Sequence, residues 1–374
     1  MSLDAFYRAP DPMTPEPPGT MIRSERLPAS AEPGVDARVY RVLYHSRSMT
    51  GADTAVSGIV AVPNRRAPST GYPVLSWSHA TTGIADTCAP SRQASPSIPF
   101  LQSWIAAGYV VAATDYEGLG TAGIHPYLVG VSEGRSVLDA ARAARHLVGS
   151  RASDKVAIDG HSQGGHAALF AGQLAHTYAP DLDVVGVVAI APVSNVASLA
   201  PSVPGTAPDV GAVVAIMALA AWSKTYPDMP LDLALTGEAG VKADATISTE
   251  CAPGVGNAFS GTPADQIFQP GWSATPVVAD HIAANDPGAV HTASPILVVQ
   301  GGADPLITAP TTEALVDQRL CRAQHDTVRF DLYPGDDHGT VLTDSGTQVA
   351  KWIAARFAGT RATSTCGHSR LSTG

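Results

Sequence analysis

The segment that decides the fold reads Lys155-Val-Ala-Ile-Asp-Gly-His-Ser-Gln-Gly-Gly-His-Ala-Ala-Leu-Phe-Ala-Gly-Gln-Leu-Ala175. A short apolar run, typical of a buried strand, passes into Gly-x-Ser-x-Gly at 160–164, and an apolar helical pattern follows. In this order the three parts form a sharp turn that presents a nucleophilic serine. Glycines are needed two positions before and after the serine because the tight turn leaves no room for side chains. The following helix directs its N-terminal N–H groups at the serine, which favours negative charge there. We therefore predict that Ser162 is a nucleophile.

A second Gly-x-Ser-x-Gly match, Gly130-Val-Ser132-Glu133-Gly134, also precedes a helical pattern. It follows a loop rich in Gly and Pro, with at most a short strand at 127–129, so the required strand is weak. Glu133 would also place a carboxylate beside a developing negative charge. We therefore interpret Ser132 as the N-cap of a helix over 132–148 and favour Ser162 as the nucleophile.

Short apolar runs alternate with helical patterns on both sides of this segment. Such alternation predicts a mostly parallel sheet with helices on both faces. Two earlier β-rich runs, 39–44 and 56–62, suit an antiparallel hairpin. The other expected strands are 74–77, 109–114, 155–159, 184–190, 296–300 and 328–333, and the expected helices are 99–107, 132–148, 165–178, 311–318 and 346–357. Together with the serine turn, this pattern predicts an α/β-hydrolase fold, one domain over 1–374 with about eight strands, the first few antiparallel.

Two parts of the chain lie outside the alternation. Residues 1–35 are expected to form an N-terminal arm, in which the Pro- and Gly-rich stretch 9–34 predicts an extended segment on the surface with no packed element. Residues 194–294 show no clear strand, one apolar helix candidate at 209–222, and Pro and Gly clusters at 201–208 and 252–263. Because both ends of this interval return to strands of the same sheet, we expect an inserted, largely helical cap over the sheet's edge.

A serine hydroxyl is a weak nucleophile, so a histidine must accept its proton and a carboxylate must orient that histidine. In this fold the order along the chain is Ser, then Asp or Glu, then His. Asp304 follows the expected strand 296–300, and His338 lies in the loop after the strand 328–333. The carboxyl ends of parallel strands meet at one edge of the sheet, where ligands bind. The sequence therefore predicts a catalytic triad of Ser162, His338 and Asp304.

Other histidines and carboxylates fit this order less well. Asp336 and Asp337 stand too close to His338 for a strand-end acid, and we interpret them as turn residues. His161 and His166 precede the acid in the chain, and we expect His161 to pack under the turn. The remaining histidines considered lie in the expected cap or in loops: His281, His291 and His325.

A serine that attacks a carbonyl group also needs two hydrogen-bond donors for the oxyanion that forms. One is expected from the backbone N–H of Gln163, directly after the nucleophile. The other is expected from Ser78-His-Ala-Thr-Thr-Gly83, which follows the strand 74–77. We predict Thr81 as this second donor, with Ala80 as the alternative.

Composition restricts the remaining classes of function. The 374 residues carry a net charge of -10, which disfavours nucleic acid as a partner because an acidic surface repels phosphates. The longest apolar run, 210–222, is too short for a transmembrane segment.

Cys88, Cys251, Cys321 and Cys366 form no CxxC pair, which disfavours a metal site and suits two disulfides in an oxidising compartment. Three pairings remain open, and four buried free thiols are the alternative. The first residues have no signal-peptide pattern, so either the chain is cytoplasmic or its signal is not part of this sequence. The cysteines favour the second alternative, a secreted chain.

Several motifs together resemble those of the secretory lipases, the fungal lipase A type and its actinobacterial relatives. They are Ser78-His-Ala-Thr-Thr-Gly-Ile-Ala-Asp-Thr-Cys-Ala-Pro-Ser91, Ala113-Thr-Asp-Tyr-Glu-Gly-Leu-Gly120, His125-Pro-Tyr-Leu128, Gly160-His-Ser-Gln-Gly-Gly165 and Tyr333-Pro-Gly-Asp-Asp-His338. The resemblance covers nearly the whole chain. It implies a secreted α/β-hydrolase with a helical cap that hydrolyses carboxylic esters, often acylglycerols. It also implies that Cys88 pairs with Cys251 and that Cys321 pairs with Cys366.

The resemblance has one departure and leaves alternatives open. The family usually has His-Gly-Thr-Thr-Gly where this chain has Ala80 in second place, which would shift the donor loop if a glycine conformation is required there. The expected partner is a small-molecule or lipid ester, with contact at lipid interfaces also considered. No metal or organic cofactor is expected, because an acyl-enzyme route uses only side chains and water. The alternatives are a serine aminopeptidase or amidase, for which Glu117 could anchor an amine, and a non-catalytic binding protein.

Overall fold

A nine-stranded sheet runs through the computed structural model, which describes residues 2–28, 30, 34–93, 98–200 and 209–367. Across the sheet the strands follow the order β1-β2-β3-β5-β4-β6-β7-β8-β9. The pairs β1–β2, β2–β3 and β3–β5 are antiparallel, and every pair from β5 to β9 is parallel. The strands are β1 (Met21–Arg26), β2 (Ala37–Arg47), β3 (Asp53–Pro63), β4 (Tyr72–Ser78), β5 (Val110–Thr114), β6 (Ala152–His161), β7 (Asp183–Ile190), β8 (Ile296–Gly301) and β9 (Val328–Tyr333). This arrangement confirms the predicted α/β-hydrolase fold.

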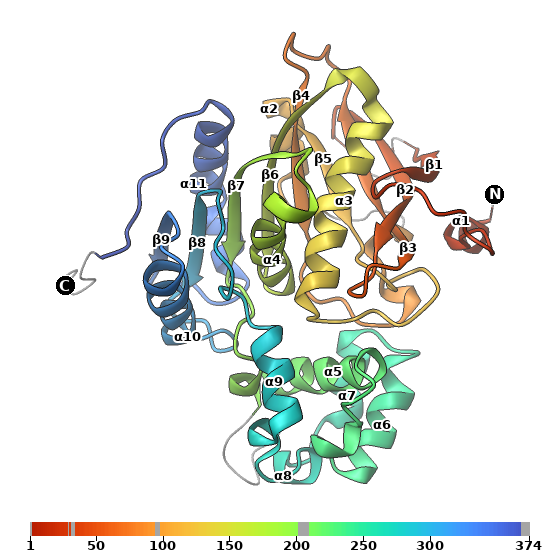
Figure 1. Ribbon diagram of the computed structural model, residues 1–374, viewed down its shortest axis with the longest axis vertical. Helices are drawn as coiled ribbons and strands as arrows, with labels where there is room; N and C mark the ends of the chain where they lie inside the picture. The colour runs from red at the N-terminus through yellow and green to blue at the C-terminus, as the bar shows by residue number, and fades with distance from the viewer. Residues whose placement is uncertain (1, 29, 31–33, 94–97, 201–208, 368–374) are drawn as a thin grey trace.

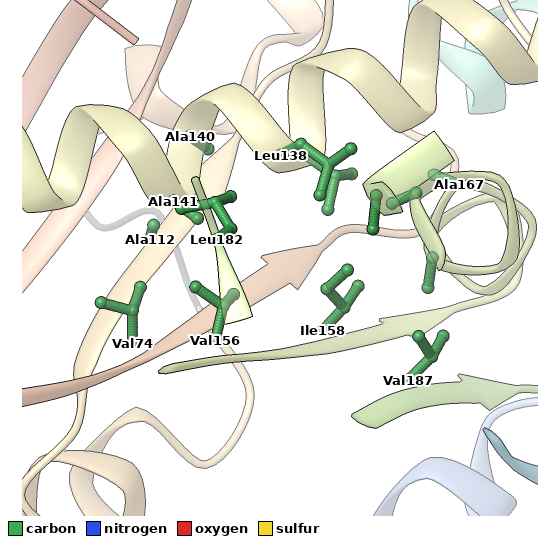
Figure 2. Close-up of a cluster of buried hydrophobic side chains, with 14 of the residues drawn as sticks. Val74, Ala112, Leu138, Ala140, Ala141, Val156, Ile158, Ala167, Leu182 and Val187 are labelled. Atoms are coloured by element: carbon green, nitrogen blue, oxygen red, sulfur yellow. The ribbon is translucent and has the colours of Figure 1, made fainter. Parts of the chain in front are cut away.

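Helices cover both faces of the sheet (Figure 1). Helices α3 (Gly130–Val148) and α4 (Gln163–Tyr178) pack on one face, and α2 (Leu101–Ala107) and α11 (Thr340–Phe357) pack on the other. The alternation of side chains along β6 explains the two layers. Val156 and Ile158 join the cluster that contains Leu138 of α3, as Figure 2 shows, whereas Ala157 joins the cluster under α2 and α11.

The N-terminal arm is better packed than its composition predicts. We expected no packed element over 9–34, but β1 pairs with β2 and supplies a ninth strand at the edge of the sheet. A short helix, α1 (Leu3–Tyr7), also buries Phe6 and Tyr7 against Leu43. The prediction was wrong because β1 is an edge strand with only partial burial, so its sequence lacks the apolar alternation of an inner strand.

A helical insertion occupies the chain between β7 and β8, and we refer to residues 194–294 by that name. Figure 1 shows its helices gathered beyond one end of the sheet. They are α5 (Val210–Thr225), α6 (Gly237–Ile247), α7 (Ala252–Phe259), α8 (Ala264–Ile267) and α9 (Pro276–Ala284). The Asp209 side chain caps α5 by accepting from the Ala212 N–H. An apolar core surrounds Trp222 and Met217 of α5, whose side chains are fully buried, and it also includes Tyr127 and Leu128 from the loop before α3.

Two further expectations concern details of helical structure. The Pro- and Gly-rich cluster 201–208 lies outside the described residues, whereas the cluster 252–263 contains α7. The helix expected at 311–318 is α10 (Ala309–Ala314), which continues as a π-helix over Leu315–Ala323. Among the described residues, no helix has both the length and the apolar character needed to cross a membrane.

Candidate active site

Ser162 occupies the turn between β6 and α4, with a backbone conformation of φ 59° and ψ -118°. This conformation is strained for a residue with a side chain, and it persists only where the surroundings enforce it. The glycines of the motif make the turn sterically feasible. A Cβ atom on Gly160 would lie 2.1 Å from the Gly164 carbonyl oxygen, and one on Gly164 would lie 1.9 Å from the Ser78 carbonyl oxygen. Both positions therefore require glycine, because neighbouring backbone atoms lie too close to leave room for a side chain.

The three residues of the predicted triad come together from three strand ends. His338 Nε2 lies 3.0 Å from Ser162 Oγ, and His338 Nδ1 lies 2.7 Å from Asp304 Oδ2. Asp304 Oδ1 accepts from the backbone N–H groups of Leu306 and Ile307, which fixes the carboxylate. Burial pushes the pKa of Asp304 upward, but the hydrogen bond and charge of His338 and these backbone donors outweigh it. The pKa of Asp304 therefore lies below its ordinary value, and the carboxylate is charged.

His161 contacts the triad instead of merely packing under the turn. Its Nε2 lies 2.8 Å from the His338 carbonyl oxygen, and the two imidazole rings are 4.8 Å apart. Burial, with a further contribution from His338, lowers the pKa of His161 to about 4. A neutral His161 therefore donates from Nε2 to this carbonyl group. The contact restrains the loop that carries His338.

Of the two predicted oxyanion donors, Gln163 directly follows Ser162 in the chain, and Thr81 lines the same cavity as Ser162. Gln163 is the first residue of α4, where backbone N–H groups have no partner within the helix. Ala80 and Thr81 line the same cavity as Ser162 and His338. The Thr81 hydroxyl is hydrogen-bonded to the Tyr127 hydroxyl at 2.7 Å. Ala80 has no left-handed backbone conformation, so its methyl group is compatible with the conformation of this loop.

The cavity over Ser162 has a volume of about 380 Å³ and is mostly apolar. The helical insertion supplies most of its wall. Val213 and Met217 come from α5, Pro253 and Gly256 come from α7, and Leu306 comes from the loop after β8. The described residues that line it include no carboxylate.

Disulfides join Cys88 to Cys251 and Cys321 to Cys366, the pairs that the family resemblance implies. The first connects the loop after β4 to the start of α7, beside the cavity. The same junction has a backbone hydrogen bond of 2.9 Å from the Ala252 N–H to the Thr82 carbonyl oxygen. The second disulfide attaches the C-terminal segment to the π-helix, away from Ser162.

The competing candidates have other contacts. Ser132 is fully buried inside α3 and donates to the Glu117 carboxylate, so it cannot reach the cavity. It is not the N-cap, which is Val129, because α3 begins two residues earlier than predicted. Asp337 caps the turn before α11 by accepting from the backbone N–H groups of Gly339 and Thr340. Among the described residues, no cluster of His, Cys, Asp and Glu could hold a metal ion.

The sequence reasoning missed one group of residues near the site. Glu133 is not among the described residues that line the cavity, and its carboxylate contacts His166 and the side chain of Gln163. Its place in a second serine motif gave no indication of this role. These contacts could have been predicted from Glu133 and His166 only if α3 and α4, which carry them, had been recognised as helices that pack closely together.

Comparison with known proteins identifies relatives among the lipases. Residues 93–365 match the sequence profile of the secretory lipases. The chain is 27% identical to a probable inactive lipase of Mycobacterium tuberculosis, over 96% of this chain and 82% of that protein. It is 28% identical to lipase A of Moesziomyces aphidis, over 49% of this chain and 41% of that protein.

Solved structures share the fold at low sequence identity. Candida antarctica lipase A in its closed state has a TM-score of 0.82 at 19% identity, covering 100% of this chain and 91% of that one. The rice cell wall degrading esterase LipA of Xanthomonas oryzae has a TM-score of 0.73 at 20% identity, covering 92% of this chain and 100% of that one. At these identities the likeness concerns the fold alone.

Proposed function

Because the chain belongs to the secretory lipase family, we propose that it hydrolyses carboxylic esters, acylglycerols among them, through an acyl-enzyme formed on Ser162. The observation that carries the proposal is the continuous hydrogen-bonded path from Asp304 through His338 to Ser162 Oγ at a strained turn. Family membership and the two disulfides fit an extracellular protein. Residues 194–294 act as a cap that encloses the acyl chain of the substrate.

The first half of the reaction transfers the acyl group to the enzyme. Ser162 Oγ attacks the ester carbonyl carbon while its proton moves to His338 Nε2, and the carbonyl oxygen becomes an oxyanion. This oxyanion accepts from the backbone N–H of Gln163 and from that of Thr81 or Ala80. The bond to the alcohol oxygen then breaks, and that oxygen leaves with the proton from His338. Asp304 stabilises the imidazolium that exists in between.

The second half releases the acid and restores the enzyme. Water attacks the acyl carbon while one of its protons moves to His338 Nε2. The new tetrahedral intermediate collapses, the bond to Ser162 Oγ breaks, and this oxygen takes back the proton. The products are a carboxylic acid and free enzyme, so every step uses side chains, backbone donors and water.

The chemistry of the cavity favours an ester over a peptide substrate. A cavity of small apolar side chains suits an acyl chain, which is stabilised by removal from water. An aminopeptidase would need a carboxylate to bind the substrate's amine. Glu117, the residue considered for this task, accepts from Ser132 and is not among the described residues that line the cavity.

The proposal is tested by comparing p-nitrophenyl butyrate hydrolysis by the wild type, Ser162→Ala and Ser132→Ala. We expect the Ser162→Ala variant to lose at least about 10⁴-fold in kcat. The Ser132→Ala variant should stay within about threefold, because Ser132 is buried away from the cavity. Comparable activity of Ser162→Ala and the wild type would overturn the proposal. An inactive wild type would favour the binding-protein alternative, and faster cleavage of a p-nitroanilide peptide would favour the peptidase.

A further inference from the structure

A buried polar network lies directly behind the nucleophile turn, and none of the steps above uses it. Its centre is Glu133 of α3, whose side chain has no exposed surface. Glu133 Oε1 accepts from the Leu128 N–H at 2.9 Å and from Gln163 Nε2 at 2.8 Å. Glu133 Oε2 lies 2.8 Å from His166 Nδ1. A carboxylate is costly to bury without partners, so these contacts strongly constrain the groups that make them.

The partner histidine fixes where the protons of the network lie. His166 Nε2 is 2.9 Å from the Asn285 carbonyl oxygen, which can only accept, so this nitrogen carries a proton. The contact of 2.8 Å between His166 Nδ1 and Glu133 Oε2 is a second hydrogen bond of this imidazole ring. Glu133 Oε1 therefore remains available as an acceptor for its two N–H donors.

Both amide hydrogens of the Gln163 side chain are used in this network. One is donated to Glu133 Oε1, and the other to His125 Nε2 at 3.0 Å. Burial lowers the pKa of His125 to about 4, so its ring is neutral. Its Nδ1 donates to the Glu117 carbonyl oxygen at 2.9 Å, which leaves Nε2 free to accept. The Gln163 side chain is thus fixed between two acceptors, and it is 1% exposed.

We propose that Glu133 is a positioning residue that holds the backbone N–H of Gln163 in the oxyanion hole; this inference rests on the proposed function. Gln163 adjoins the strained Ser162, and a strained turn keeps its geometry only when its neighbours are over-determined. An oxyanion donor must lie within about 2.7–3.1 Å of the developing charge, so a small rotation of residue 163 weakens it. Glu133 acts through Gln163 and does not touch the substrate.

The same network reaches the second side of the oxyanion hole. Leu128 adopts a left-handed backbone conformation, with φ 55°, and donates its N–H to Glu133. Its neighbour Tyr127 holds the Thr81 hydroxyl, and the Tyr127 carbonyl oxygen accepts from Trp222 Nε1 of α5 at 3.0 Å. Glu133 therefore supports the loop behind both predicted donors, and the helical insertion supports the same loop.

The experiment compares Glu133→Ala, Glu133→Gln and the matched control Asp139→Ala. Asp139 is a second fully buried carboxylate of α3, hydrogen-bonded to Ser46, Tyr178 and Arg142 and not to the nucleophile turn. For each variant, kcat and KM are measured per active site titrated with a fluorophosphonate. The inhibition constant of a trifluoromethyl ketone is measured as well. This inhibitor forms a tetrahedral adduct on the serine, so its affinity measures how well the oxyanion hole binds an oxyanion, independently of kcat and KM.

In the Glu133→Ala variant we expect kcat to fall about 10- to 100-fold, less than the 10²–10³-fold loss from deleting an oxyanion donor outright. KM should stay within about threefold, and the inhibition constant should rise by the factor by which kcat/KM falls. Glu133→Gln should recover most of kcat, because its carbonyl oxygen still accepts from Gln163 and Leu128 while its NH₂ group donates to His166 Nδ1. Asp139→Ala should lower Tm and leave kcat per site near the wild-type value.

Two results would overturn the positioning role. One is equal kcat per titrated site in Glu133→Ala and Asp139→Ala, and the other is an equal loss in Glu133→Gln and Glu133→Ala. If Glu133→Ala does not fold, Gln163→Met carries the same test, because it removes both side-chain donors and keeps the size. Full kcat in that variant overturns the role as well. A wild type without esterase activity overturns the proposed function itself, and the role of Glu133 with it.

Discussion

Replacing each disulfide by a pair of serines shows which bond supports the active site and which bond only stabilises the fold. The two bonds close stretches separated by 163 and 45 residues. The chain-entropy relation for loops of these lengths gives about 5 kcal/mol for Cys88–Cys251 and about 4 kcal/mol for Cys321–Cys366. With about 2.1 cal/mol/K of unfolding entropy per residue, these losses correspond to decreases in Tm of about 6 °C and about 5 °C. The two variants should therefore be destabilised to a similar extent.

Activity should distinguish the two variants. Cys251 precedes α7, which lines the cavity, and its disulfide holds α7 against the loop that carries Thr81. The variant Cys88→Ser/Cys251→Ser should therefore lose about 10-fold or more in kcat/KM, the usual result when a catalytic group is displaced slightly. The variant Cys321→Ser/Cys366→Ser should keep its kcat/KM.

The assay is p-nitrophenyl butyrate hydrolysis at a temperature well below both melting points, with Tm measured on the same non-reduced samples. The reasoning would be refuted by equal losses of kcat/KM in the two variants. It would also be refuted if the Cys88→Ser/Cys251→Ser variant kept wild-type kcat/KM.

Three smaller changes test individual residues of β6 and of the turn that follows it. Burial raises the pKa of Asp159 to about 7, whereas an unfolded Asp titrates near 3.9, so the stability of the fold falls as pH rises from about 4 to 7. Asp159→Asn removes this titration, so its gain in Tm over the wild type should be about 3 °C larger at pH 8 than at pH 5, measured by differential scanning fluorimetry. An equal gain at both pH values would contradict this. His161→Phe keeps an aromatic ring against His338 but loses the hydrogen bond to the His338 carbonyl oxygen, so kcat/KM should fall about 10-fold. An unchanged kcat/KM would show that this hydrogen bond does not orient His338. Gly164→Ala would place a Cβ atom 1.9 Å from a backbone oxygen of β4, and thermal melts should show a loss of at least about 3 kcal/mol. Gly237→Ala, with no atom within 4 Å, is the control and should not destabilise.

The fold and the arrangement of the predicted triad follow from local patterns in the sequence. The run before Ser162 is apolar because β6 is buried on both faces, and the motif glycines are needed for backbone approach. Asp304 and His338 could be selected because each follows a recognisable strand, and parallel strands end at a common edge. These features are set by neighbours in the chain, so sequence patterns reveal them.

The missed features depend on contacts between distant segments. β1 has little apolar alternation because it lies at the edge of the sheet and relies on β2 for its hydrogen bonds. The contacts of Glu133 depend on how α3 packs against α4, which brings His166 and Gln163 within reach. The sequence shows that residue 133 is a glutamate, and only the packing shows which groups its carboxylate contacts.

The most direct test of the central claim is to treat the wild type and Ser162→Ala with a fluorophosphonate and locate the adduct by fragment mass spectrometry. Only a serine activated by a neighbouring base reacts rapidly with this reagent. We predict one adduct per chain in the wild type, located on Ser162, and none in the variant. An unlabelled wild type, or an adduct on another serine, would contradict the assignment of Ser162 as the nucleophile.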